Sequence, residues 1–215
     1  RSILEPEKNW RVIFVRSSRL FTPALIADAD LLITARTGIA DPIDLTTDAV
    51  NDTVIPGTIL WTDENVRAIL DNVSGRGMGF LALHNTLYCR NENITDFMDI
   101  EPVMHRAVQP LWVYDINQDH PITQGIDKFW IPLDEQFGAV IKSPDTVSLF
   151  STQAMHDKRT AVGGWCLERG NGRIACLLPG HTADPYRHPS YRDIVWRAAH
   201  WAARQDVLPH PDPEK

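Results

Sequence analysis

Cysteine is scarce in this sequence, and the three that occur form none of the short pairs that hold zinc ribbons. Cys89, Cys166 and Cys176 are odd in number and widely spaced, which gives no disulfide framework. Cys166 and Cys176 lie in apolar, strand-like runs, where buried small hydrophobic residues are expected. At 215 residues, the chain is long enough to be stabilised by a hydrophobic core alone.

The sequence also lacks long apolar runs and an excess of positive charge. No apolar stretch approaches the roughly 20 residues of a membrane-spanning helix, so we expect a soluble protein with no membrane partner. Lys and Arg number 21 against 28 Asp and Glu, a formal net charge of −7. Nucleic acid is a poor fit as a partner, because phosphate binding uses clustered basic side chains. The first residues carry no secretory pattern, so the cytoplasm is the expected location.

Hydrophobic patterns predict alternating strands and helices in the first half of the chain. Short β-rich runs at 11–15 and 29–35 are typical of buried parallel strands. Residues 36–60 have no clear period, which predicts irregular structure or an active-site flap. A helix with regularly spaced apolar residues begins at Thr62 and precedes a buried strand at 78–83. A helix followed by such a strand is half of a βαβ unit and predicts a parallel sheet covered on both faces.

The second half of the chain is richer in strands. They are predicted at 111–114, 129–133, 146–152, 161–167 and 173–178. Asn171-Gly172 between the last two is a strong hairpin signal and predicts an antiparallel portion of the sheet. A capping box at Ser190–Asp193 precedes the last helix. We expect a single domain over residues 1–208 and a disordered tail over residues 209–215.

Two loops that follow predicted strands carry histidines. His84 comes directly after the buried strand, and His181 and His188 lie between the last strand and the last helix. Because ligands bind beyond the carboxyl ends of strands in open α/β sheets, the two loops can converge on one site. A lone loop histidine is more often an ordinary hydrogen-bonding group, but three of them at two strand ends favour a function.

Asp134 and Glu135 follow another predicted strand and add two carboxylates. Such groups can orient an imidazole or act as a base, although an exposed acidic turn explains them equally well. Neighbours on a strand point to opposite faces, so these two are a poor pair for conventional glycoside hydrolysis. That reaction, with Asp184 as a further candidate carboxylate, ranks third among the possible functions.

Several short blocks, taken in order over roughly residues 77 to 204, resemble the ThuA-like (trehalose utilisation) family. The blocks are Gly79–His84, Asp119–Thr123, Asp134-Glu135, Arg169–Ile174, Pro179–His181, His188-Pro189 and Ala198–Ala203. The resemblance implies an α/β fold like that of class I glutamine amidotransferases and flavodoxin. This is a three-layer sandwich with a mostly parallel sheet and an antiparallel hairpin near the C-terminus.

The resemblance also implies a function in sugar catabolism. The substrate would be a carbohydrate, a 3-keto-glycoside or a disaccharide such as a trehalose derivative, and the enzyme a hydrolase, lyase or isomerase. We assign acid–base catalysis to His84, Glu135 and His181. Substrate binding is assigned to Asn85, Asp134, Tyr186, Arg187 and His188. A divalent metal such as zinc is a candidate cofactor, with His84, His181 and His188 as its possible ligands.

The sequence departs from the family pattern and its relatives in two places. The strand at 78–83 ends in Leu83-His84, where amidotransferases carry a nucleophilic cysteine, so Cys-dependent amidotransfer is not expected. ThuA-like chains usually begin with an additional strand and helix, whereas here the run at 11–15 corresponds to their second strand. A shortened variant, a first βα unit outside this sequence and a site completed by a second copy in a homo-oligomer are the alternatives. A non-catalytic sugar-binding or regulatory protein is therefore the rival function.

Overall fold

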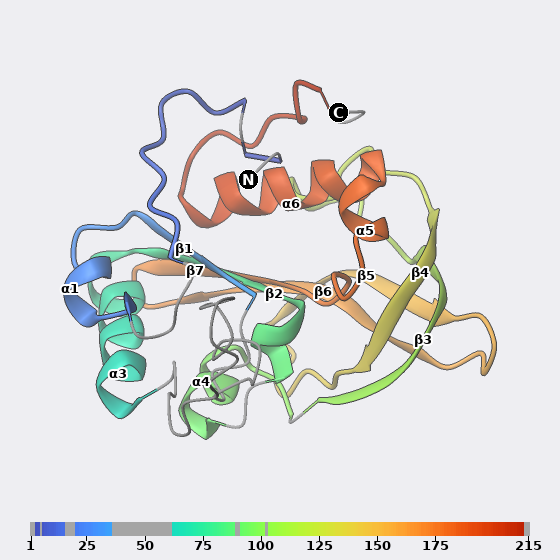
Figure 1. Ribbon diagram of the computed structural model, residues 1–215, viewed down its shortest axis with the longest axis horizontal. Coiled ribbons are helices and arrows are strands. Elements are labelled where there is room, and N and C mark those ends of the chain that lie inside the picture. The colour runs from blue at the N-terminus through green and yellow to red at the C-terminus, as the bar shows by residue number, and fades with distance from the viewer. Residues whose placement is uncertain are drawn as a thin grey trace, which may run out of the picture.

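The computed structural model describes residues 3–4, 6–15, 20–35, 62–88, 91–101 and 103–212, apart from the side chain of His105. Within these ranges, seven strands form one sheet in the order β1-β2-β7-β6-β5-β3-β4 (Figure 1). The strands are β1 Leu31–Thr34, β2 Gly79–Leu83, β3 Met104–Tyr114, β4 Phe129–Gly138, β5 Val147–Ala154, β6 Thr160–Arg169 and β7 Gly172–Leu177. The predicted loop or flap at 36–60 lies outside the described residues.

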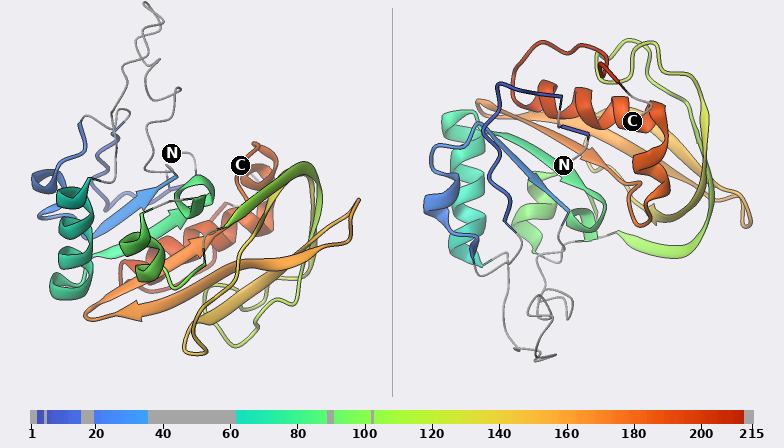
Figure 2. Two further views of the ribbon diagram at one scale, coloured as in Figure 1. Left: turned by 90° about the horizontal axis from the view of Figure 1, so that it is seen from below. Right: turned by 45° about the horizontal axis from the view of Figure 1, so that its top comes forward.

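The sheet has a parallel half and an antiparallel half. β1, β2 and β7 run parallel, and all other neighbouring pairs, β7-β6, β6-β5, β5-β3 and β3-β4, are antiparallel. The α/β class is confirmed, but the prediction of a mostly parallel sheet is wrong. β5, β6 and β7 follow one another through turns too short for the crossover that parallel neighbours need. The antiparallel half curls away from the parallel half (Figures 1 and 2).

Helices cover the sheet on both faces. They are α1 Pro23–Ile26, α3 Asp63–Asp71, which continues as the π-helical turn η2 Asn72–Arg76, the 3-10 turn η3 His84–Tyr88, α4 Glu92–Phe97, α5 Asp184–Arg187 and α6 Pro189–Ala202. α6 lies over one face and α3 and α4 over the other (Figure 1). Along β2, Phe80 and Ala82 pack in the core on the α3 side, while Leu81 and Leu83 pack in the core under α6. Both faces of the parallel half are therefore buried, which explains its continuous apolar runs.

The described residues near the chain ends differ from two predictions. The segment 11–15 is not a strand; its side chains are exposed, because β propensity forms a strand only where a neighbouring edge pairs with it. The tail is packed as far as Asp212. His210 is 4% exposed, its N–H donates to Asp193 Oδ1 at 2.7 Å, and its ring lies 2.9 Å from the carbonyl oxygen of Ile3.

Candidate functional site

His84 lies at the carboxyl end of β2, where the sequence placed it. Its φ of +35° is in the left-handed region that few residues other than glycine adopt. The side chain is 2% exposed and stacks on Phe137 with ring centroids 4.4 Å apart. His84 Nδ1 is 2.7 Å from the carbonyl oxygen of Leu178. Since a carbonyl can only accept, Nδ1 carries the proton and Nε2 carries the lone pair.

The lone pair of His84 Nε2 faces a carboxylate. Glu135 Oε2 lies 3.5 Å away, and Nε2 has no hydrogen-bond partner among the described residues. Burial lowers the pKa of His84, against the raising effects of the Leu178 carbonyl and Glu135, so the ring is neutral at pH 7. A buried acceptor nitrogen that faces a carboxylate is unfavourable unless a proton or a cation lies between them.

His181 completes a cluster of three side chains. It lies in the loop after β7, and its Nδ1 is 3.4 Å from the same Oε2 of Glu135. The rings of His84 and His181 meet edge to face at 5.4 Å. Glu135 is 12% exposed and His181 is 46% exposed, so the cluster reaches solvent on the His181 side. The structure thus brings together the three residues that we predicted to be catalytic.

The geometry of this cluster fits a metal ion. One ligand atom from each of His84, Glu135 and His181 lies within 4.8 Å of the other two. Zinc binds histidine nitrogen and carboxylate oxygen at about 2.1 Å, which places tetrahedral ligands about 3.4 Å apart. Glu135 Oε2 lies 3.5 Å from His84 Nε2 and 3.4 Å from His181 Nδ1, and both distances match this value. Three protein ligands leave one coordination position open, as in catalytic rather than structural zinc sites.

A β-bulge in β4 determines where the two carboxylates point. Leu111 pairs with Ile131 and Gln109 with Asp134, so β4 has one more residue than β3 over this stretch. Asp134 is fully buried on the α6 side, where its two oxygens accept the N–H groups of Gly180 at 2.8 Å and Thr182 at 2.9 Å. Asp134 and Glu135 thus point to opposite faces of the sheet.

Asp134 holds the loop that carries His181, which differs from the substrate-binding role that we predicted. Burial raises its pKa to about 6, against the lowering effect of the N–H groups that it accepts. Gly180 lets this loop pass close to the cluster. A Cβ atom at this position would lie 2.3 Å from Tyr186 Oη and 3.1 Å from His84 Cβ.

The other predicted substrate residues have different contacts. Asn85 follows His84 in η3 and is partly buried. Tyr186 is partly buried, and burial raises its pKa to about 12. Arg187 has a 78% exposed side chain whose guanidinium lies 3.7 Å from the Asp184 carboxylate.

His188 is not part of the cluster of His84, Glu135 and His181. Its Nδ1 accepts the N–H of Ser190 at 3.2 Å, and its ring stacks on Phe129 at 4.4 Å. It is therefore the N-cap of α6. The predicted capping box at Ser190–Asp193 is wrong, because the N-cap of α6 lies two residues before Ser190 and the helix begins at Pro189.

Two features of the site went unnoticed in the sequence. The Leu178 carbonyl fixes the tautomer of His84, and Phe137 supports its ring. Neither has a sequence signal, because both depend on how distant strands are aligned.

Burial raises the pKa of Cys166 to about 12 and that of Cys176 well above its usual value, so neither thiol is an activated nucleophile. Cys89 lies outside the described residues.

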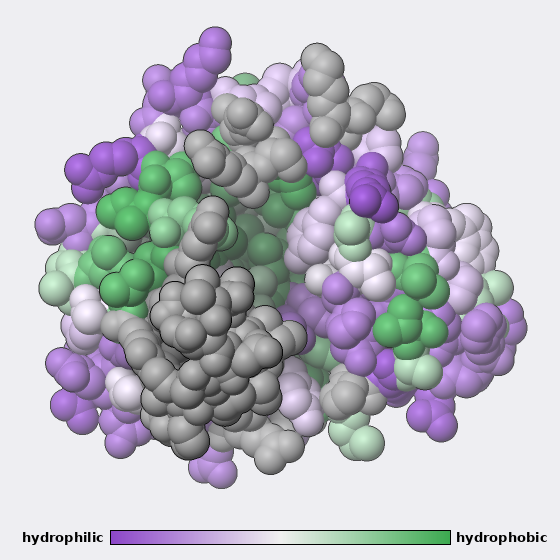
Figure 3. Space-filling view, in the orientation of Figure 1, coloured by the Kyte–Doolittle hydropathy of each residue, from purple (hydrophilic) through white to green (hydrophobic). Residues whose placement is uncertain are grey.

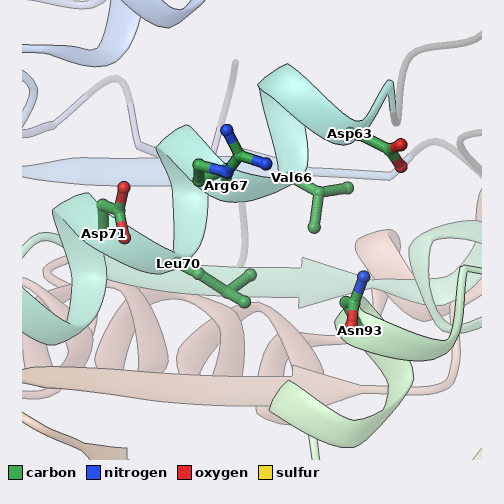
Figure 4. A pocket seen from close by; sticks show the side chains of 6 residues that line it. All are labelled: Asp63, Val66, Arg67, Leu70, Asp71 and Asn93. Atoms are coloured by element: carbon green, nitrogen blue, oxygen red, sulfur yellow. The ribbon is translucent and has the colours of Figure 1, made fainter.

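A cavity lies elsewhere in the protein, away from the His84 cluster. It measures about 370 Å³, and Asp63, Val66, Arg67, Leu70, Asp71 and Asn93 line it between α3 and α4 (Figure 4). None of these residues belongs to the His84 cluster. No helix in the described parts of the chain is long and apolar enough to cross a membrane.

Parallel strands that deliver side chains from their carboxyl ends, between layers of helices, define an α/β protein. The family model for ThuA, trehalose utilisation, matches residues 5–202, and the chain belongs to this family. No curated protein matches it.

Solved structures agree on the fold. A protein described as ThuA-like from Parabacteroides merdae is 16% identical with a TM-score of 0.71, over 96% of this chain and 83% of the other. A cytoplasmic protein of Salmonella typhimurium LT2 is 15% identical with a TM-score of 0.59, over 94% and 84%. A Thermoplasma acidophilum protein described as part of a GMP synthase is 10% identical with a TM-score of 0.51, over 94% and 85%.

Proposed function

We propose that this protein is a metal-assisted acid–base enzyme of sugar catabolism that acts on a 3-keto-glycoside or a disaccharide such as a trehalose derivative. The observation that carries the proposal is the cluster of His84, Glu135 and His181. Its spacings suit zinc, and its buried His84 Nε2 has no hydrogen-bond partner in the described parts of the chain. Membership of the trehalose utilisation family supports a carbohydrate substrate.

The proposed ligands are His84 Nε2, His181 Nδ1 and the Glu135 carboxylate. A bound divalent metal such as zinc would supply a Lewis acid that polarises a sugar carbonyl. The Leu178 carbonyl holds the proton of His84 on Nδ1, and the lowered pKa keeps Nε2 deprotonated at pH 7. Both effects favour binding, because imidazole binds a metal in its neutral form.

The proposed reaction is an elimination followed by hydration. A 3-keto group acidifies the neighbouring C–H, and the carboxylate oxygen of Glu135 that does not bind the metal would accept that proton. The glycosidic C–O bond then breaks, its electron pair leaves with the oxygen, and this oxygen takes up a proton. Water, which can reach the cluster on the exposed His181 side, would supply that proton. Addition of water to the resulting enone completes a net hydrolysis.

Tyr186 and Asn85 are proposed to position substrate hydroxyls. The raised pKa of Tyr186 keeps its phenol neutral and able to donate a hydrogen bond at pH 7.

We also propose a cytoplasmic location and a homo-oligomeric state. The Salmonella protein of similar fold, which is described as cytoplasmic, supports the proposed location.

The test combines metal analysis with turnover. We expect about one zinc per chain by elemental analysis, and loss of 3-keto-trehalose cleavage after chelation that added zinc restores. His84→Ala and His181→Ala should abolish both, while Arg159→Ala, at an exposed side chain with no proposed role in the site, should retain both. Cleavage that survives both histidine variants would overturn the proposal. Calorimetric binding of sugars without turnover would instead indicate the non-catalytic alternative.

Hydrolysis by two carboxylates has less support. Asp134 points to the opposite face from Glu135 and accepts two backbone N–H groups. The Asp184 carboxylate is paired with Arg187 in α5. No second carboxylate among these candidates therefore joins Glu135 to form the required pair.

A further inference from the structure

Two tryptophans pack side by side on the outside of the curled half of the sheet. Trp112 of β3 and Trp130 of β4 are directly paired, and their ring centroids lie 4.4 Å apart at an angle of 37°. Their neighbours Leu111 and Val113 are buried, whereas Trp130 is 45% exposed. A small hydrophobic patch lies among hydrophilic residues on the molecular surface over β3 and β4 (Figure 3). The pair is therefore an aromatic surface rather than part of the core.

This aromatic surface lies on the same face of the sheet as Glu135. Residues 130 and 135 are five apart, so in a regular strand their side chains would point to opposite faces. The bulge in β4 adds one residue and reverses the alternation. β3 is regular here, with Val108 opposite Glu135 and Trp112 opposite Trp130. The four-residue step between these two pairs corresponds to about 13 Å.

Polar side chains continue the row of the two tryptophans. Trp112 pairs with Gln153 of β5, and Gln153 pairs with Thr160 of β6. Paired residues share a face, so two indole rings, an amide and a hydroxyl lie in line across four strands. A sugar ring offers apolar C–H groups on its face and hydroxyls at its edge. Aromatic rings beside hydrogen-bonding groups complement both.

We propose that Trp112 and Trp130 form a distal subsite that binds a sugar ring of an oligosaccharide whose reacting bond lies at the His84 cluster. The inference rests on the proposed function and extends it, because about 13 Å is too far for a monosaccharide to span. A second copy of the chain is the other occupant to consider. Edge-to-edge pairing at β4 is hindered there, since the Thr182 hydroxyl donates to the Leu133 carbonyl at 2.5 Å.

The experiment measures binding directly, with tryptophan fluorescence and saturation-transfer NMR. The probes are maltotetraose, cellotetraose and laminaritetraose, with glucose as the monosaccharide. We expect at least one tetrasaccharide to bind, with its Kd raised about tenfold by Trp130→Ala and much less by Trp130→Phe, and little change for glucose. Val147→Ala, at another exposed apolar residue of the same sheet, is the control and should leave binding unchanged. Thermal melts verify that each variant is folded.

The subsite and the catalytic proposal fail separately. His84→Ala should abolish turnover. It should still allow a tetrasaccharide to bind to the indoles of Trp112 and Trp130, because this binding does not require the His84 cluster. The subsite is overturned if no tetrasaccharide binds or if Trp130→Ala binds as tightly as the wild type. A dimer in size-exclusion chromatography that Trp130→Ala dissociates would also overturn it, and would assign the surface to a contact between copies.

Discussion

The parallel and antiparallel halves of the sheet contribute to the site in different ways. β2 and β7 are buried on both faces, and the cluster residues His84 and His181 follow their carboxyl ends. β4 is an edge strand with an exposed outer face, and it contributes Glu135 from within the strand, next to a bulge. A strand end positions a side chain through chain direction alone, whereas a residue within a strand also depends on register.

The two halves of the sheet also contribute different chemical groups to the cluster. The parallel half provides the two imidazoles of the cluster, and the antiparallel half provides its carboxylate. β4 also supplies Asp134, which fixes the loop of His181 from the opposite face. Each half of the site therefore depends on the other, and variants in β4 test that dependence.

The largest expected effect comes from removing the charge of the antiparallel half. Glu135→Gln keeps the shape of the side chain but loses the anionic oxygen that faces both imidazoles. We expect a loss of about 10²–10⁴ in kcat/KM on 3-keto-trehalose, and zinc well below one per chain. Glu168→Gln, at an exposed carboxylate paired with Arg173, is the control and should change neither. Full zinc content and full activity in Glu135→Gln would show that the side chains of the parallel half are sufficient for zinc binding and catalysis.

The positions of the site residues that follow strand ends could be predicted from the sequence. His84 and His181 were found because apolar runs mark buried strands and the residues after them lie at one sheet edge. The antiparallel direction of β6 against β7 was predicted from the Asn171-Gly172 turn and is confirmed. The directions of β3, β4 and β5 were not predicted, because periodicity identifies a strand but not its neighbour. The bulge was also missed, and with it Phe137 and the shared face of Trp130 and Glu135.

Gly180→Ala tests how closely the loop after β7 packs against Tyr186 and His84. The added Cβ would lie 2.3 Å from Tyr186 Oη, at a φ of +150° that side chains rarely adopt. We expect the free energy of unfolding to fall by about 3–4 kcal/mol, with loss of zinc binding as the loop moves. Gly75→Ala meets no atom within 4 Å and is the matched control, expected to be neutral or slightly stabilising. Chemical denaturation measures both, and equal stability of the two variants would contradict the close packing.

Asp134→Asn tests the support that β4 gives to the loop, through its pH dependence. The pKa of Asp134 is about 6 in the folded protein, against 3.8 for an ordinary aspartate such as that of the unfolded chain. The folded state therefore holds the proton more tightly, and this contribution to stability is full below pH 4 and is lost as the pH rises through 6. The difference between the two pKa values corresponds to at most about 3 kcal/mol.

The measurement is the free energy of unfolding of both proteins between pH 4 and 7. We expect the wild type to lose stability relative to Asp134→Asn over this range, because the amide cannot ionise. Asp145→Asn, at an exposed carboxylate, should show no such trend and is the control. A difference that stays constant with pH would mean that the N–H groups of Gly180 and Thr182 fully offset the burial of the charge.

The smallest expected effect distinguishes His188 from the two cluster histidines of the parallel half. As the N-cap of α6, His188 accepts the backbone N–H of Ser190, so His188→Ala should cost about 1 kcal/mol of stability. His188→Asn should recover most of this loss, because asparagine is a good N-cap, although the ring contact with Phe129 is gone. Neither change should alter zinc content. A loss of zinc in His188→Ala that His188→Asn does not restore would return His188 to the metal site and exclude a purely structural role.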